Sequence, residues 1–164
     1  MDLDPETRRL TGTHQAHTPA ELERWYASCI ADLSRLDLAI IDRPRGPWVG
    51  EAVLNAFDSP TRSCGLRILL ARRDSFGRGL GTESLELVLR HAFQRVHLHR
   101  IELTVYAFNP RARHVYEKLG FRHEGTRREA LFWEGAWVDA HTMALLSDEY
   151  TDGRLNPSTT GPET

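Results

Sequence analysis

The strongest constraint on the fold is a short glycine-rich segment that separates two apolar stretches. Three glycines occupy every second position in it: Gly77, Gly79 and Gly81. The apolar run from Leu66 to Ala71 before it is typical of a buried strand, and apolar residues recur at helical spacing from Leu85 to Val96 after it. Strand, glycine loop and helix in this order can present backbone N–H groups to a phosphate at a helix N-terminus.

Two common phosphate-binding loops do not fit this segment. Thr82 and Glu83 follow Gly81, where a P-loop requires Lys and then Ser or Thr. The third glycine also falls one residue short of the dinucleotide-binding pattern. A tight loop that only joins a strand to a helix is the alternative that the segment alone leaves open.

The rest of the chain predicts a mixed α/β fold. Thr18, Pro19 and Glu21 favour the start of a helix that runs to about Leu33. One face of that helix would be apolar: Leu22, Trp25, Tyr26, Cys29, Ile30 and Leu33. A short helix is expected between Asn109 and Gly120. Strands are expected at Leu38–Asp42, Trp48–Phe57, Ser63–Ala71, Arg100–Phe108, Phe121–Leu131 and Trp137–Leu146.

Length and composition indicate one domain, at residues 1–150, followed by a polar tail at 151–164 that we expect to be disordered. No periodicity is evident in residues 1–18. A net charge of −2 does not favour nucleic-acid binding. No apolar stretch is long enough to span a membrane and the N-terminus lacks a signal-peptide core, so we expect a cytoplasmic protein.

Metal chemistry is not expected. Cys29 and Cys64 are too few for a disulfide framework or a zinc site. His97 and His99 alternate, but no third ligand stands at a convincing spacing, so a polar loop is the simpler interpretation.

A second motif, about thirty residues after the glycine loop, favours a functional interpretation of that loop over a plain connection. This motif is NPRARHVYEKLGF, from Asn109 to Phe121. Together with the glycine loop and the segment from Arg127 to Leu146, it resembles the GNAT superfamily of N-acetyltransferases, and most closely the RimJ/RimL-like branch. The resemblance covers roughly Leu38 to Tyr150. It implies a central, mostly antiparallel mixed sheet flanked by helices, with a V-shaped splay between two central strands.

The resemblance also implies acetyl-CoA as cosubstrate and a role for particular positions. The loop Gly77, Arg78, Gly79, Leu80, Gly81, with Phe76 and Thr82 at its ends, matches the pyrophosphate-binding loop. Asn109 matches the asparagine that binds the pantetheine arm, and Tyr116 matches the tyrosine that protonates the departing thiolate. A backbone N–H among Ile68, Leu69 and Leu70 would polarise the thioester carbonyl. For Tyr116 the alternative is packing with its apolar helix neighbours against the sheet.

Two departures from the family pattern stand out. Many members have Gln or Arg where this chain has Phe76, so that side-chain contact to phosphate is missing. There is also little room before residue 18 for the strand with which members usually begin and which helps to build the substrate-side wall. Arg111 and Arg113 either meet the 3′-phosphate of CoA or form the solvated face of their helix.

The proton acceptor for the attacking amine is less well indicated. Glu51, Glu102 and His141 lie on expected strands and could face the cleft. We rank Glu51 and Glu102 together, ahead of His141, because Glu102 shares a strand face with Tyr106. For each, a solvated or structurally paired side chain is the alternative.

The predicted function is acetyl transfer from acetyl-CoA to a primary amine, by direct attack in a ternary complex. The acceptor would be a small molecule or a protein N-terminus, with no metal, nucleic acid or membrane involved, and a homodimer is compatible with these features. The alternative is a non-catalytic CoA-binding regulatory module of the same fold.

Overall fold

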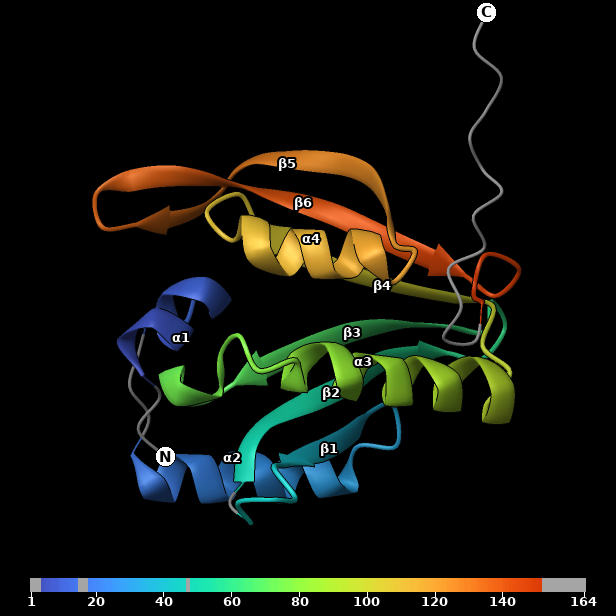
Figure 1. The fold of residues 1–164 in the computed structure, drawn as a ribbon, viewed down its shortest axis with the longest axis horizontal. Helices are drawn as coiled ribbons and strands as arrows, with labels where there is room; N and C mark the ends of the chain where they lie inside the picture. Colours follow the sequence, from blue (N-terminus) through green and yellow to red (C-terminus); the bar gives the residue numbers. More distant parts are fainter. Residues whose placement is uncertain (1–3, 15–17, 47, 152–164) are drawn as a thin grey trace, which may run out of the picture.

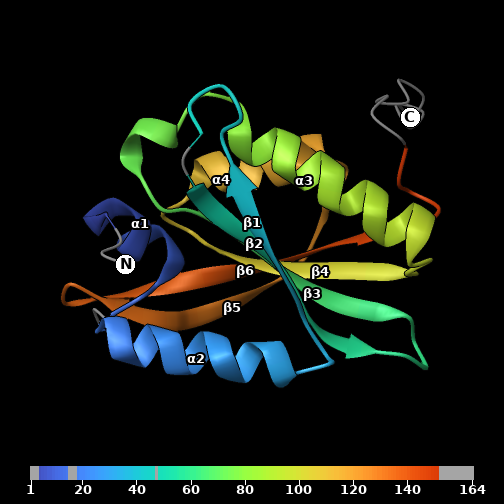
Figure 2. The same cartoon turned by 90° about the horizontal axis from the view of Figure 1, so that it is seen from below.

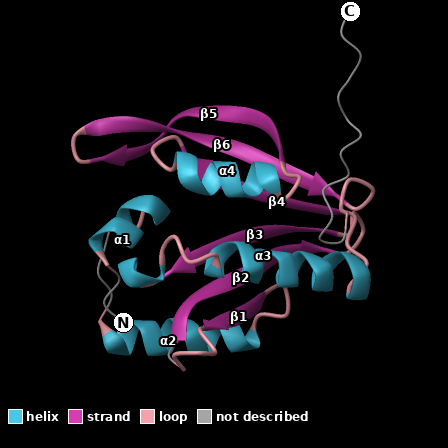
Figure 3. Cartoon of the chain, in the orientation of Figure 1, coloured by secondary structure: helices cyan, strands magenta, loops and turns pink. Residues whose placement is uncertain are grey.

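A six-stranded sheet forms the centre of the computed structural model, which describes residues 4–14, 18–46 and 48–151 (Figure 1). The strands are β1 (Leu36–Ile41), β2 (Trp48–Asp58), β3 (Ser63–Leu70), β4 (Arg100–Tyr106), β5 (Arg122–Trp133) and β6 (Ala136–Leu146). The α-helices are α1 (Pro5–Thr11), α2 (Pro19–Ala31), α3 (Leu80–Arg90) and α4 (Pro110–Lys118). A short 3₁₀ turn, η1 (Arg73–Ser75), precedes the glycine loop, and a π turn, η2 (His91–Arg95), extends α3 (Figure 3).

The sheet order is β1-β2-β3-β4-β6-β5, and every neighbouring pair is antiparallel except β3 and β4. That parallel pair is short. It matches Ser63 with Arg100, Cys64 with Ile101 and Gly65 with Glu102, and beyond those residues the two strands separate. The mixed sheet and the splay between its central strands confirm the predicted fold class.

Helices α3 and α4 cover one face of the sheet, and the core lies between them and that face. Helix α2 lies on the opposite face (Figure 2). Helix α3 buries Leu85, Val88 and Leu89, the apolar positions at helical spacing. Strand β4 alternates as predicted, with Ile101, Leu103 and Val105 buried. The helix-covered face of the sheet is therefore apolar, and the polar residues of β4 point to the other face.

Helix α2 begins as predicted, with Thr18 and Glu21 forming a capping box. Its expected apolar face is only partly buried, because Trp25 is 39%, Ile30 85% and Leu33 96% exposed. The helix ends at Ala31, so Leu33 lies beyond it. It lies over one edge of the sheet, where only a narrow stripe of side chains turns inward.

Helix α1 was not predicted. Asp4 caps it by accepting a hydrogen bond from the Glu6 N–H at 2.9 Å, and Pro5 occupies its first turn. Gly12 ends it with a φ of 67°. These are ordinary start and stop signals, but seven residues are too few to show a hydrophobic period.

Four further expectations concern the C-terminal tail, membrane-spanning helices, metal sites and the two cysteines. The tail from residue 152 lies outside the described residues. No described helix is long and apolar enough to cross a membrane. The described residues contain no cluster of three or more His, Cys, Asp or Glu suited to a metal ion, and His99 Nδ1 lies 3.3 Å from Ser147 Oγ. Both cysteines are buried and unpaired.

Candidate active site

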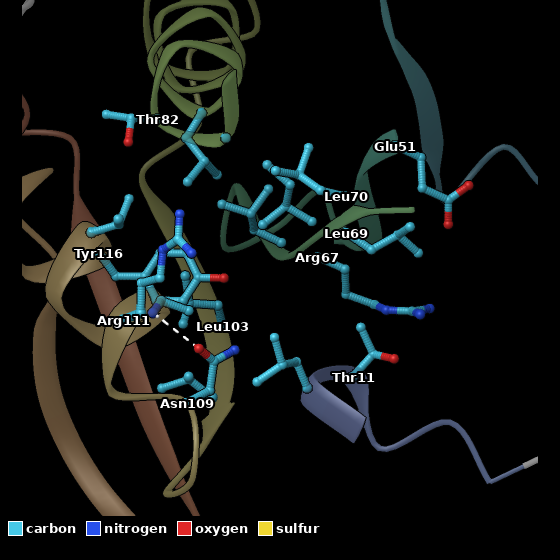
Figure 4. Close-up of a pocket in the computed structure, with 18 of the residues that line it drawn as sticks. Thr11, Glu51, Arg67, Leu69, Leu70, Thr82, Leu103, Asn109, Arg111 and Tyr116 are labelled. Carbon is cyan, nitrogen blue, oxygen red and sulfur yellow. Dashed lines mark hydrogen bonds between the residues drawn. The ribbon is translucent and has the colours of Figure 1, made fainter. Parts of the chain in front are cut away.

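A cavity of about 490 Å³ opens where β3 and β4 separate (Figure 4). Its walls come from β2, β3 and β4, from α1, from the glycine loop and from the start of α4. Strand pairing that stops after three residues leaves the two facing strand edges without partners in the sheet. An elongated ligand with amide groups can hydrogen-bond to such edges as an added strand does.

The glycine loop presents unpaired backbone N–H groups at one end of this cavity. The first hydrogen bond of α3 runs from the Glu83 N–H to the Gly79 carbonyl, at 2.9 Å. The N–H groups of Leu80, Gly81 and Thr82 therefore precede the helical bonds and have no backbone partner among the described residues. Gly79 has a φ of 80°, and a Cβ built on it would meet no atom within 4 Å. The loop therefore leaves these N–H groups accessible at a helix N-terminus, an arrangement that can bind an anion.

The Arg78 side chain points away from the cavity, although its backbone belongs to the loop. Arg78 Nη2 lies 2.7 Å from Asp42 Oδ2, and the Asp42 side chain is only 2% exposed. Asp42 follows β1, so this ion pair joins the glycine loop to the turn before β2. The Arg78 cation thus serves to position the loop, while its charge is taken up by Asp42.

Arg111 supplies positive charge on the cavity side instead. It lines the cavity, and its guanidinium lies 5.7 Å from the ring centroid of Phe76. Its Nη2 would be 3.4 Å from a Cβ on Gly77, which places it beside the glycine loop. Arg113, by contrast, bonds Glu117 on its own helix at 2.9 Å and does not line the cavity. The two arginines that the sequence left undecided therefore have different surroundings.

Helix α4 directs Asn109 and Tyr116 toward the same cavity. The Asn109 Oδ1 accepts the Ala112 N–H at 3.1 Å, so it caps the helix as predicted (Figure 4). Tyr116 is buried, and burial raises the pKa of its phenol to about 12. No described residue hydrogen-bonds to this hydroxyl. It is therefore a protonated donor at neutral pH that has no partner within the described chain.

On β3, the pairing pattern narrows the choice of N–H donor. The Ala71 N–H donates to the carbonyl of Val49, a residue of β2, at 2.8 Å. Because backbone groups alternate in direction along a strand, the N–H groups of Leu70 and Ile68 point toward the splay, and that of Leu69 points toward β2. The Thr7 hydroxyl of α1 donates to the Leu70 carbonyl at 2.8 Å, which is also on the open edge.

The two candidate carboxylates lie on the sheet face opposite α3 and α4, and their surroundings differ. Glu51 is 9% exposed and its Oε2 accepts a hydrogen bond from the Tyr26 hydroxyl at 3.0 Å. Burial, with a further contribution from the Glu51 charge, raises the pKa of Tyr26 to about 12. Glu102 is exposed and lies 3.2 Å from Arg100. Both line the cavity.

His141, Tyr26 and helix α1 each differ from what the sequence predicted. His141 Nδ1 lies 3.0 Å from Thr126 Oγ1 and does not line the cavity. Tyr26 was assigned only to an apolar helix face, because its partner Glu51 is 25 residues away and no local pattern links them. Thr7, Leu10 and Thr11 of α1 line the cavity in a segment where no element was predicted.

Comparisons with known proteins show the family and the fold that this chain shares. Residues 1–122 match the family model described as an acetyltransferase (GNAT) domain. The spermidine N(1)-acetyltransferase of Vibrio cholerae is 30% identical over 79% of this chain and 74% of its own length. The [ribosomal protein uS5]-alanine N-acetyltransferase of Escherichia coli is 33% identical over 48% of this chain. That match spans 40% of the relative's own length, and the matches to two other relatives span 40% and 42% of theirs.

A solved structure extends the likeness to the fold. The crystal structure of spermidine N-acetyltransferase from Vibrio cholerae in complex with CoA and spermine superposes with a TM-score of 0.82. The two share 26% sequence identity, and the match covers 88% of this chain and 85% of the other.

Replacing Arg78 by methionine is expected to destabilise the fold by about 3 kcal/mol, because it leaves the buried Asp42 carboxylate without its cation. Urea unfolding measures this loss, and adding Asp42→Asn to the variant should recover part of it. Arg73→Met, at an exposed side chain near the same loop, is the control and should change stability by less than about 0.5 kcal/mol. Equal effects of Arg78→Met and Arg73→Met would contradict an anchoring role for the pair.

Proposed function

The chain belongs to the GNAT acetyltransferases, in their RimJ/RimL-like branch, and we propose that it transfers an acetyl group from acetyl-CoA to a primary amine. One observation carries the proposal. The unpaired N–H groups of the glycine loop and the Tyr116 phenol open onto a single cavity between two separated strands. That cavity has an anion site at one end and a proton donor deeper inside, which suits a phosphate-bearing thioester.

The chain offers a contact for each part of acetyl-CoA. The N–H groups of Leu80, Gly81 and Thr82 would hold the pyrophosphate, with Arg111 beside them. The open edges of β3 and β4 would pair with the amides of the pantetheine arm. Asn109 stands where β4 ends and α4 begins, so its amide can reach that arm while its oxygen caps the helix.

The reaction forms one bond and breaks another. The amine nitrogen attacks the thioester carbon, a C–N bond forms, and the C–S bond breaks. The N–H of Ile68 or Leu70 stabilises the negative charge that develops on the carbonyl oxygen. Tyr116 gives its proton to the departing sulfur and regains one from the nitrogen. Before the attack, Glu51 takes one proton from the incoming ammonium, directly or through water, and releases it to solvent.

Glu51 suits the role of proton acceptor better than Glu102 does. The Tyr26 hydroxyl holds the Glu51 carboxylate in one orientation, and no cation of the described residues forms an ion pair with it. Glu102 is drawn toward Arg100, which also binds Glu124. An alkyl ammonium has a pKa of about 10, so a group that removes its proton is needed at neutral pH.

Acetyl-CoA is expected to stabilise the protein by about 2.7 kcal/mol when its concentration is 100 times Kd. Gly81→Val should abolish the accompanying rise in melting temperature, because its side chain would occupy the space of the phosphate. Gly81 has no left-handed φ, and a Cβ there would meet only Leu70 Cδ1 at 3.8 Å, so the variant should fold. Glu86→Val, on the exposed side of the same helix, is the control and should keep the shift. Retention of the shift in Gly81→Val would remove the loop from the binding site.

Tyr116→Phe is expected to lower kcat by about 100-fold or more and to leave the acetyl-CoA shift in melting temperature unchanged. The change removes only the hydroxyl, so packing against the sheet is kept. Release of CoA thiol with an accepted amine measures kcat. Since the pKa of Tyr116 is about 12, the contribution of the phenol should decline only as pH rises toward that value. A kcat within about twofold of the parent would identify Tyr116 as a packing residue.

Glu51→Gln is expected to lower kcat/KM by about 100-fold near pH 7, and by less near pH 10, where more of the amine is already unprotonated. Glu102→Gln, on the same face of the sheet, should cost much less. Initial rates across pH for both variants measure the difference. A larger loss in Glu102→Gln would assign the base to Glu102, and a loss in Glu51→Gln that does not shrink with pH would argue for a structural role.

These assays also distinguish the non-catalytic alternative. A chain that gains stability from acetyl-CoA but releases no thiol with a broad panel of amines would be a CoA-binding module.

A further inference from the structure

Arg67 is a cation on the acceptor side of the cavity that has no partner among the described residues. Its side chain lies on β3 and lines the cavity. It makes no hydrogen bond or ion pair with any described residue. Figure 4 shows Arg67 on the side of Glu51 and Thr11, across the cavity from Tyr116 and Arg111. Since the other lining arginine, Arg111, belongs to the glycine-loop end, Arg67 is the cation that an acceptor would meet.

The strand register places Arg67 and Glu51 on one face as diagonal neighbours. Glu51 is opposite Leu69, and Val53 is opposite Arg67. Residues that are paired in this way point to the same face, and diagonal neighbours are within reach of long side chains. The two opposite charges nevertheless form no ion pair, and Glu51 accepts a hydrogen bond from Tyr26. A carboxylate and a free guanidinium therefore line one wall side by side.

Glu102 does not neutralise Arg67 either. Glu102 lies on β4, opposite Gly65 of β3, and its Oε2 forms an ion pair with Arg100 Nη2 at 3.2 Å. The acceptor wall thus combines one carboxylate held for proton transfer with one guanidinium left open. A polyamine would bring several positive charges next to that guanidinium, which is electrostatically unfavourable.

We propose that the acceptor is a small primary amine that carries a carboxylate, with the carboxylate bound by Arg67 and the amine directed toward Glu51. The inference rests on the proposed acetyltransferase function and adds the class of acceptor to it. A guanidinium presents parallel N–H donors that match the two oxygens of a carboxylate, so it supplies both affinity and orientation. Neutral amides of the same amines lack the charge and would bind weakly.

Matched acceptors test the proposal. Amino acids such as glycine and β-alanine are compared with glycinamide and β-alaninamide, a peptide amide and spermidine, using CoA thiol release. We expect kcat/KM for the carboxylate forms to exceed that for the corresponding amides by at least tenfold. In Arg67→Gln this preference should disappear, mainly through a higher KM for the carboxylate forms, with a much smaller change in kcat/KM for the amides. Arg67→Lys should restore part of the preference.

The control is Arg128→Gln, an exposed arginine on β5 that does not line the cavity, which should keep the parent preference. An unchanged acetyl-CoA shift in melting temperature shows that Arg67→Gln is folded. Turnover of spermidine or of the amides at least as efficient as that of the carboxylate forms would overturn the inference and leave the acetyltransferase function standing. A carboxylate preference that survives Arg67→Gln would also overturn it. If no amine of any class releases thiol, the proposed function falls and the inference falls with it.

Discussion

The separation of β3 from β4 after three paired residues is the feature on which the rest of the site depends. Sheet strands normally satisfy one another's backbone groups, and an unpaired buried N–H or C=O is costly. Two open edges inside a sheet are therefore stable only if something else can bond to them. Part of the β3 edge is met by the Thr7 hydroxyl of α1. The remainder faces a cavity into which the glycine loop and α4 also open, so a single interruption of the sheet creates both the space and the donors.

The two faces of the sheet contribute differently to the site. On the face covered by α3 and α4, alternating apolar residues form the core and hold the helix N-terminus at the mouth of the cavity. On the other face, the same strands present Glu51, Arg67 and Glu102. Because side chains alternate along a strand, a chain that packs its core well on one face necessarily orders the polar residues on the other. The proposed cosubstrate and acceptor sites thus share their strands but not their side chains.

Long-range polar contacts then fix the loops and helices whose positions do not follow from the alternation of side chains along the strands. The Asp42–Arg78 ion pair joins the glycine loop to the turn after β1, and the Tyr26–Glu51 hydrogen bond joins α2 to β2. Both involve a nearly buried carboxylate, which is strongly destabilised without its partner. Such contacts hold a site rigid, and they also explain why Arg78 lies in a phosphate-loop motif while its side chain points elsewhere.

The sequence by itself determined the six strands, the helices other than α1 and the two motifs, because these follow from local rules. Glycine spacing, the Asn109 cap and the alternation in β4 each act over a few residues, and each reappears in the structure. Helix α1 could have been found from Asp4, Pro5 and Gly12, but seven residues show no period. Only the tertiary structure decided which polar side chains meet. Tyr26 and Glu51 are 25 residues apart, Arg78 and Asp42 belong to different loops, and the absence of a partner for Arg67 among the described residues depends on where the other strands place their side chains. Those relations depend on the sheet register and on the placement of α2, which arise from packing across the whole chain and leave no pattern in any short stretch of it.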